Sequence, residues 1–152
     1  MMKIVATNRK AHRDYHVLET VECGIELRGT EVKSLRENGA NLKDGFARVE
    51  KDEVFLYNIH ISPYAYGNIH NHEPERVRRL LLKRGQIRTL KEKVGQKGFT
   101  LVPLTLYFKR GYAKIELGIV RGKRTYDKRE TIRKKETQRE IDRALRQRQK
   151  GL

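Results

Sequence analysis

The feature that most limits the fold is a pair of alternating segments on either side of Lys109–Gly111. In the second segment Ala113, Ile115, Leu117 and Ile119 recur at every second position, and residues 99–108 show the same two-residue period. A period of two indicates extended strands, and the short polar break between them indicates a hairpin turn. A strand pair of this length must cover an apolar face, so we expect a mainly β fold.

Two further stretches show strand patterns. Residues 15–27 alternate on both sides of Gly24, which predicts two strands joined by a bend or bulge at that glycine. Phe46–Glu50 and Glu53–Ile61 predict a second hairpin that turns at Lys51–Asp52.

Helices are predicted at two places. Thr30 can cap a short helix that turns Val32 and Leu35 toward the core and stops at Gly39. After a loop at 62–74, residues 75–94 predict one or two helices with a break at Gly85.

This order of elements favours an OB-fold-like antiparallel Greek-key barrel with peripheral short helices, because strands and helices do not alternate as βαβ units. We expect an RNA-binding barrel over residues 1–120 and a basic tail over 121–152. The sequence shows no internal repeat at solenoid periods.

Charge is concentrated in that tail. The chain has 35 Lys and Arg against 19 Asp and Glu, a net charge of +16, and half of this excess lies in residues 121–152. The tail has few apolar anchors, so we expect it to be disordered alone and helical when an anion neutralises its repulsion. A solvated helix packed on the body is the alternative. The excess charge indicates a polyanionic partner, for which nucleic acid is the default.

Several classes are disfavoured. No stretch has the roughly 20 apolar residues that a membrane span needs, and MMKIVATNRK has no apolar signal segment. A lone cysteine, Cys23, excludes an internal disulfide and fits a reducing compartment. We therefore expect a cytoplasmic protein with no membrane partner.

Catalytic chemistry has little support. His60, His70 and His72 could ligate a metal, and His70 with His72 could act as acid and base in a ribonuclease. Loop histidines are more often solvated, and nucleotide-binding loops, cysteine clusters and nucleophile motifs are missing from the sequence. We expect no enzyme, metal site or cofactor.

The sequence has more candidate residues for nucleic-acid binding than for catalysis. Asn8, Arg9, Lys10 and Arg13 form a basic segment before the first predicted strand. Arg76, Arg78 and Arg79 would cover a broad arc of the predicted helix, and either group alone could be a solvated face. Five tyrosines could stack on bases or lie half-buried in the barrel: Tyr15, Tyr57, Tyr64, Tyr66 and Tyr107.

Five sequence motifs resemble those of a known protein family. NRKAHRDY, ECGIELRGTEVKSLR, PERVRRLLL, LVPLTLY and GKRTYDKR occur in the order and spacing of the SsrA-binding protein (small protein B) family, over nearly the whole chain. The resemblance implies an OB-fold adaptor that binds the tRNA-like domain of transfer-messenger RNA and delivers it to stalled ribosomes. It implies no catalysis. A structural ribosomal protein that binds ribosomal RNA permanently is the alternative.

The resemblance also implies partners and site residues. This protein would contact elongation factor Tu and alanyl-tRNA synthetase through the RNA that they share. Its tail would lie in the decoding centre and message channel of the small ribosomal subunit. The RNA-binding candidates are Asn8, Arg9, Lys10, Arg13, Glu22, Leu81, Lys123 and Arg124. The candidates for function on the ribosome are Tyr126, Asp127, Lys128 and Arg129. Glu22 could instead position a basic neighbour, and Leu81 could pack in the core.

Overall fold

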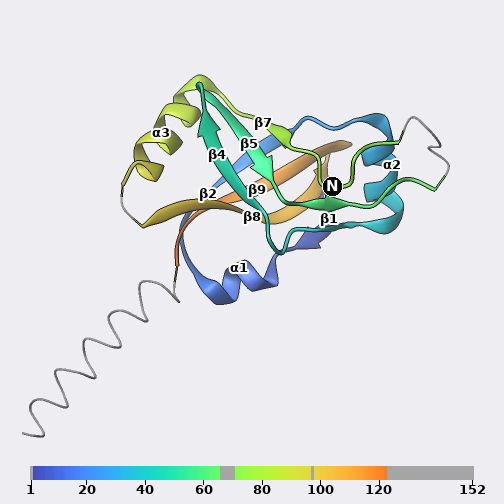
Figure 1. The fold of residues 1–152 in the computed structure, drawn as a ribbon, viewed down its shortest axis with the longest axis horizontal. Helices are drawn as coiled ribbons and strands as arrows, with labels where there is room; N and C mark the ends of the chain where they lie inside the picture. Colours follow the sequence, from blue (N-terminus) through green and yellow to red (C-terminus); the bar gives the residue numbers. More distant parts are fainter. Residues whose placement is uncertain (1, 66–70, 97, 123–152) are drawn as a thin grey trace, which may run out of the picture.

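The computed structural model describes residues 2–65, 71–96 and 98–122, which form antiparallel strands and short helices (Figure 1). The strands are β1 (Met2–Thr7), β2 (Tyr15–Ile25), β3 (Ala40–Asn41), β4 (Phe46–Glu50), β5 (Glu53–Tyr57), β6 (His60–Ile61), β7 (Arg78–Leu81), β8 (Phe99–Lys109) and β9 (Tyr112–Gly122). The helices are α1 (Arg9–Asp14), α2 (Gly29–Asn38) and α3 (Arg84–Val94). In Figure 1, α2 and α3 lie at opposite ends and α1 lies below the sheet.

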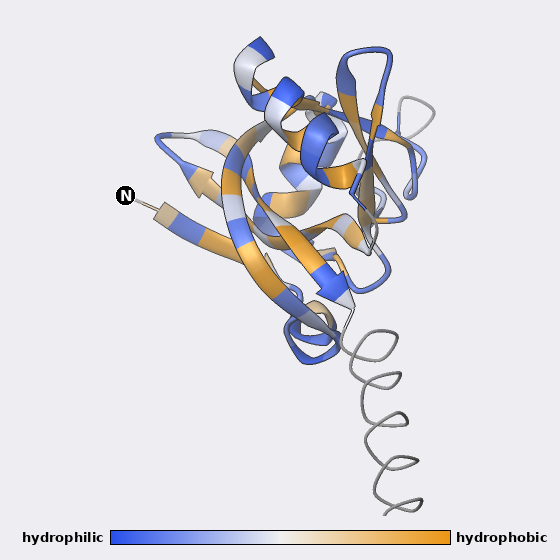
Figure 2. Ribbon diagram, turned by 90° about the vertical axis from the view of Figure 1, so that its left-hand side faces the viewer, coloured by the Kyte–Doolittle hydropathy of each residue, from blue (hydrophilic) through white to orange (hydrophobic). Residues whose placement is uncertain are grey.

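The main sheet has seven strands in the order β1-β8-β4-β5-β7-β2-β9, and β8 also pairs with β9. That pairing closes a ring of strands, in which β1 pairs with the C-terminal half of β8, while β3 and β6 form a separate small sheet. Hydrophobic and hydrophilic residues alternate along the strands (Figure 2), and the inward side chains form the core, including Val54, Leu56, Leu101, Leu106, Ile115 and Leu117. The predicted mainly β class with short helices is confirmed.

Both predicted hairpins are present. Strands β8 and β9 pair from Lys109↔Tyr112 onward, and Ile115, Leu117 and Ile119 are buried in the core as expected. Lys51 and Asp52 form the β4–β5 turn with positive φ at both residues, which matches the twist of the flanking strands. The second arm is shorter than predicted, because the chain turns after Tyr57 and residues 60–61 pair with β3 instead.

The predicted break at Gly24 is wrong. Residues 15–25 form one continuous strand, whose irregularity lies between Val17 and Glu19. Gly24 stays in the ladder opposite Leu81, where a Cβ would lie 3.1 Å from the Leu81 Cβ. The glycine therefore allows Leu81 to approach β2 closely and does not mark a bend.

The prediction of helix throughout residues 75–94 is also wrong. Residues 78–81 form strand β7 with alternating burial, so Arg78 and Leu80 point inward while Arg79 and Leu81 point outward. Helix α3 starts only at Arg84, and Gly85 lies inside it. The run of three leucines fits either period, so the apolar pattern alone did not separate strand from helix.

Two N-terminal elements were not predicted, β1 and α1. Strand β1 has no buried residue and α1 has only six residues, so neither gives a readable apolar period. Helix α2 is confirmed, but its N-cap is Arg28 rather than Thr30, and Gly39 ends it with φ at 74°. None of the described helices is long and apolar enough to cross a membrane.

Candidate nucleic-acid interface

Helix α1 carries basic side chains and is held in place by Asn8, the buried residue that caps its N-terminus. The Asn8 side chain is buried; its Oδ1 accepts from the Ala11 amide at 3.0 Å and caps the helix. Its Nδ2 donates to the carbonyls of Leu42 and Pro103, each at 2.9 Å. The Nδ2 group and the Oδ1 atom of Asn8 thus hold α1 against β8 and the segment after β3.

The basic side chains of α1 surround an open hollow of about 240 Å³. Arg9 and Arg13 are exposed, and Lys10 donates to Asp44 at 3.1 Å. The lining residues are Thr7, Asn8, Arg9, Lys10, Arg13, Asn41 and Lys43. Within the described chain, every charged residue that lines the hollow is basic, so it suits a phosphate oxygen. We call Arg9, Lys10, Arg13 and Lys43 the α1 cluster.

A second surface combines an exposed leucine with an exposed tyrosine. Leu81 is 46% exposed on the outer face of β7, and Tyr112 is 72% exposed at the β8–β9 turn. Both line a hollow of about 220 Å³ together with Gly24 and Lys114. Leu81 is therefore on the surface rather than in the core. We call these four residues the Leu81 patch.

Glu22 lies beside this patch, two residues before Gly24 on the same face of β2. Its Oε2 accepts from the Tyr107 hydroxyl at 2.6 Å and from Lys109 Nζ at 3.3 Å. The hydrogen bond from Tyr107 holds the pKa of the Glu22 carboxyl below its usual value. Glu22 thus stays ionised and positions a lysine and a tyrosine.

Arg76, Arg78 and Arg79 do not form the basic helix face that was predicted. Arg78 is fully buried, and its guanidinium lies 2.6 Å from Glu31 Oε2, while Arg76 binds the other carboxylate oxygen. Burial opposes ionisation of Glu31, but hydrogen bonds from Arg76 and the Arg28 amide keep its pKa below the usual value. Arg79 pairs on the surface with Glu26 and Glu53. These charges tie α2 to β7.

The histidines that were considered for metal binding or catalysis have other partners. His72 is buried, with Nδ1 2.9 Å from the Thr30 hydroxyl and Nε2 2.8 Å from the Ile61 carbonyl. His60 lies 3.8 Å from Glu75, and His70 is outside the described residues. The described chain holds no group of three metal-ligating side chains.

The five candidate tyrosines are in different places. Tyr107 is buried, Tyr15 packs on a small apolar cluster, and Tyr57 and Tyr64 are partly exposed. Tyr66 is outside the described residues. Tyr112 is a further exposed tyrosine that is not among these candidates, although its position one residue after the turn glycine indicates exposure.

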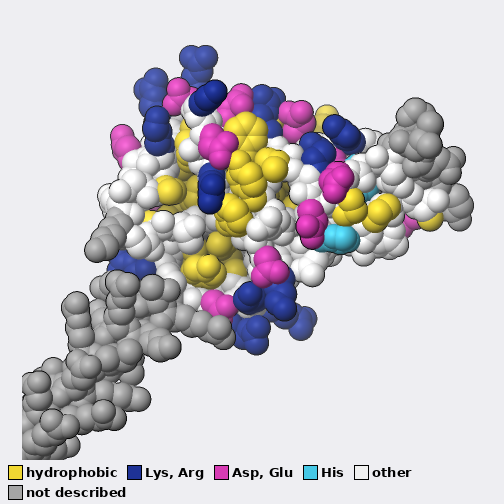
Figure 3. Space-filling model, viewed as in Figure 1, with side chains coloured by type: hydrophobic (Ala, Val, Ile, Leu, Met, Phe, Trp, Pro, Cys, Tyr) yellow, Lys and Arg dark blue, Asp and Glu magenta, His cyan; other side chains and the backbone are white. Residues whose placement is uncertain are grey.

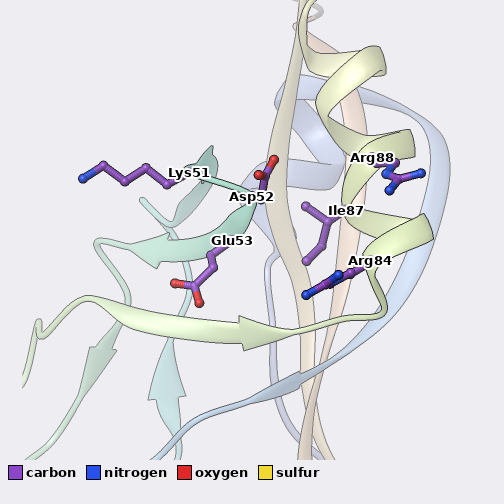
Figure 4. A pocket seen from close by; sticks show the side chains of 6 residues that line it. All are labelled: Lys51, Asp52, Glu53, Arg84, Ile87 and Arg88. Carbon is purple, nitrogen blue, oxygen red and sulfur yellow. The ribbon is translucent and has the colours of Figure 1, made fainter.

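A larger hollow of about 480 Å³ lies between the β4–β5 turn and α3 (Figure 4). Arg84 and Arg88 line it, but so do the carboxylates of Asp52 and Glu53. In Figure 4 the side chains of Lys51 and Arg88 point away from those carboxylates. Its mixed charge does not favour an anion, and it is not part of the candidate interface.

The remaining site predictions, Lys123, Arg124, Tyr126, Asp127, Lys128 and Arg129, lie outside the described residues. Among the described candidates the structure forms two groups: Asn8, Arg9, Lys10 and Arg13 at α1, and Glu22 with Leu81 near the β8–β9 turn. Seven residue steps separate Tyr15 from Glu22, so the two groups lie roughly 23 Å apart along β2.

The fold and these surfaces define a class: a small, strongly basic β protein whose exposed side chains suit a polyanion. The chain belongs to the SmpB family, because residues 5–147 match the family described as SmpB protein.

Its relatives share most of its length. It is 57% identical over 148 residues to the SsrA-binding protein of Geobacillus kaustophilus (strain HTA426), covering 97% of this chain and 96% of that one. It is 58% identical to the SsrA-binding protein of Carboxydothermus hydrogenoformans, with 97% and 99% coverage. A solved structure described as "tmRNA-SmpB: a journey to the center of the bacterial ribosome" is 52% identical with a TM-score of 0.67, covering 78% of this chain and 84% of that one.

Proposed function

We propose that this chain is an RNA-binding adaptor that acts with transfer-messenger RNA in ribosome rescue. Like other members of its family, it binds RNA without catalysing a reaction. Membership of the SmpB family at 57% identity over nearly the whole chain carries this conclusion. The α1 cluster supports it physically, because its open hollow is lined by basic and neutral side chains.

Residues 1–120 bind the tRNA-like domain of this RNA. Arg9, Lys10 and Arg13 bind phosphates, and Asn8 contributes by fixing the helix that carries them. Leu81 gives an apolar contact to a nucleotide, and Glu22 holds Lys109 and Tyr107 toward the RNA. Lys123 and Arg124 extend the basic surface into the tail. The ring of strands serves as an OB-type Greek-key barrel, a fold that commonly binds nucleic acids on its outer face.

The tail, residues 121–152, acts on the ribosome after RNA binding. Its net charge of +8 favours ordering against ribosomal RNA in the decoding centre and message channel. Tyr126 stacks on a base there, and Asp127, Lys128 and Arg129 are needed for the same step. The RNA brings elongation factor Tu and alanyl-tRNA synthetase to the complex, which places the protein in the cytoplasm.

The test compares binding and tagging in the full chain. The wild-type protein should prefer the tRNA-like domain of transfer-messenger RNA over ordinary tRNA, and Tyr126→Ala should bind it nearly as well. The same variant should fail to tag stalled peptides on ribosomes. Equal competition by tRNA would contradict the adaptor function, and a large affinity loss in Tyr126→Ala would contradict the division between body and tail.

A further inference from the structure

The outer face of the β4–β5 hairpin carries aromatic side chains that the core does not use. Phe46 and Tyr57 are register partners, and their rings stack with centroids 5.3 Å apart and planes within 9°. Both are partly exposed. Figure 3 shows a hydrophobic strip over β4 and β5, with basic side chains at both of its ends.

An arginine lies over this aromatic pair. The Arg48 guanidinium carbon is 5.2 Å from the Phe46 ring centroid and 5.7 Å from that of Tyr57. Arg48 is exposed, and Phe55 lies opposite it in register on the same face. Stacked aromatic rings beside a guanidinium plane are the side chains with which proteins hold unpaired bases.

This aromatic face is continuous with the α1 cluster. Phe46 lines a hollow of about 280 Å³ together with Lys10 and Lys43. Asp14 and Asp44 line it as well, and the Asp44 carboxylate is paired with Lys10 at 3.1 Å, so this hollow does not itself favour a phosphate. Lys10 and Lys43 also line the basic hollow of the α1 cluster, so a nucleotide whose phosphate binds there would have its base near the Phe46 ring.

The far end of the face carries charges of both signs. The Tyr57 hydroxyl donates to Glu50 at 2.6 Å, and the neighbouring Glu53 across the turn is paired with Arg79 at 3.1 Å. This end therefore suits phosphate less well than the hollow at α1, whose charged lining residues are all basic within the described chain. We therefore expect the RNA backbone on the α1 side of the face.

We propose that the face made by Phe46, Arg48 and Tyr57 is a base-stacking site for an unpaired nucleotide of the same RNA whose phosphates bind the α1 cluster. The proposal rests on the proposed function, since it takes transfer-messenger RNA as the ligand. It adds a sequence-tolerant contact that is independent of charge, because stacking uses the face of a base rather than its edge.

The experiment measures the affinity of the full chain for the tRNA-like domain at several salt concentrations. Phe46→Leu combined with Tyr57→Leu keeps the face apolar and removes both rings. We expect an affinity loss of about tenfold, within the range for one lost base stack, with an unchanged slope of log affinity against log salt. Tyr57→Phe keeps the ring and should bind like the wild type.

Phe99→Leu is the matched control, because Arg121 lies 4.7 Å over the Phe99 ring at another place on the sheet. It should change affinity less than twofold. Arg48→Gln, on the exposed surface, gives a second variant that leaves the strand pairing intact and should lose affinity several-fold. Melting curves of every variant establish that each is folded.

The outcomes separate the two proposals. If the wild-type protein does not prefer transfer-messenger RNA, the proposed function fails. If the wild type shows that preference but the folded double variant and Arg48→Gln bind equally well, the stacking site is wrong and the proposed function stands. Unchanged RNA affinity with weakened binding to ribosomes would also overturn the site, since it would make this face a contact to the ribosome.

Discussion

Arginines in two regions of this molecule have opposite surroundings. Arg78 is fully buried on β7 and pairs with Glu31, which is buried as well. Arg9 and Arg13 are exposed on α1 around a hollow whose charged lining, within the described chain, is basic. The buried arginine is neutralised inside the protein, while the exposed pair is hydrated and available to an anion from outside.

This difference shows that net charge alone does not locate a binding surface. A buried guanidinium is tolerated only with a carboxylate and further hydrogen-bond acceptors, and Arg78 also donates to the Ile59 and Pro74 carbonyls. An exposed arginine loses little hydration and remains available to a phosphate. Substitution of the buried arginine should therefore mainly lower stability, and substitution of the exposed arginines should mainly lower RNA affinity.

The largest effect is expected at the buried pair. Arg78→Ala leaves the Glu31 carboxylate buried with only Arg76 as a cationic partner, so the free energy of unfolding should fall by about 3–5 kcal/mol. Urea denaturation measures this loss. The adjacent Arg79→Ala, which removes only surface ion pairs, is the control and should cost less than about 1 kcal/mol. Similar losses in both variants would show that burial does not distinguish the two arginines.

Asn8 links the two regions, because it is a buried residue that supports an exposed cluster. Asn8→Ala removes the cap of α1 and both donors to backbone carbonyls, so unfolding should become easier by about 2 kcal/mol. RNA affinity should fall with it, since Arg9 loses its fixed position. Asn8→Asp keeps the cap acceptor but sets a buried carboxylate oxygen against the two carbonyl oxygens, so it should destabilise at least as much as Asn8→Ala. Full stability with lost affinity would instead make Asn8 a direct RNA contact.

Exposed charge should affect binding and leave stability unchanged. Arg9→Gln with Arg13→Gln should lower affinity for the tRNA-like domain about tenfold near 0.15 M salt, and lower the salt slope by about two, one for each lost phosphate contact. Filter binding over a salt series measures both. Arg79→Gln, an exposed arginine already paired with carboxylates, is the matched control and should bind within twofold. An unchanged slope in the double variant would exclude these arginines as phosphate contacts.

The same contrast explains what the sequence could and could not predict. The β8–β9 hairpin was predictable because Ile115, Leu117 and Ile119 all face the core on one strand. Strand β7 was not, because its inward residues are an arginine and a leucine. A buried Arg78 depends on Glu31, which is 47 residues away in the chain, and a local pattern cannot show such a partner.

The candidate site was predictable in composition but not in arrangement. The basic segment at residues 8–13 was readable from its charges, yet the burial of Asn8 depends on Leu42 and Pro103, which come from distant segments. Lys43 joined the cluster only through the fold. Tyr112 stood beside a turn glycine in the sequence, but its closeness to Leu81 depends on the pairing of β2 with β7 and β9.

The smallest effect is expected for Glu22 and Tyr107, a hydrogen-bonded pair in which Tyr107 is buried and Glu22 is exposed. The Tyr107 hydrogen bond lowers the pKa of Glu22 below its usual 4.5, so its stabilising effect is complete above pH 4.5 and is lost as the pH falls through the lower, folded value. Burial and the same hydrogen bond raise the pKa of Tyr107 above its usual 10. Its contribution is therefore complete below pH 10 and is lost as the pH rises through the folded value.

Glu22→Gln tests this pair without removing side-chain volume. Melting temperatures of the variant and the wild type, measured from pH 3 to pH 11, should differ most near neutral pH and converge on the acidic side, where Glu22 becomes protonated. Glu31 also has a lowered pKa and gives both proteins the same acid loss, so the difference between the two curves isolates Glu22. Two parallel curves would show that Glu22 is not coupled to Tyr107 in the folded protein. In that case its carboxylate would be free to accept hydrogen bonds from RNA directly, rather than serving to hold Lys109 in place.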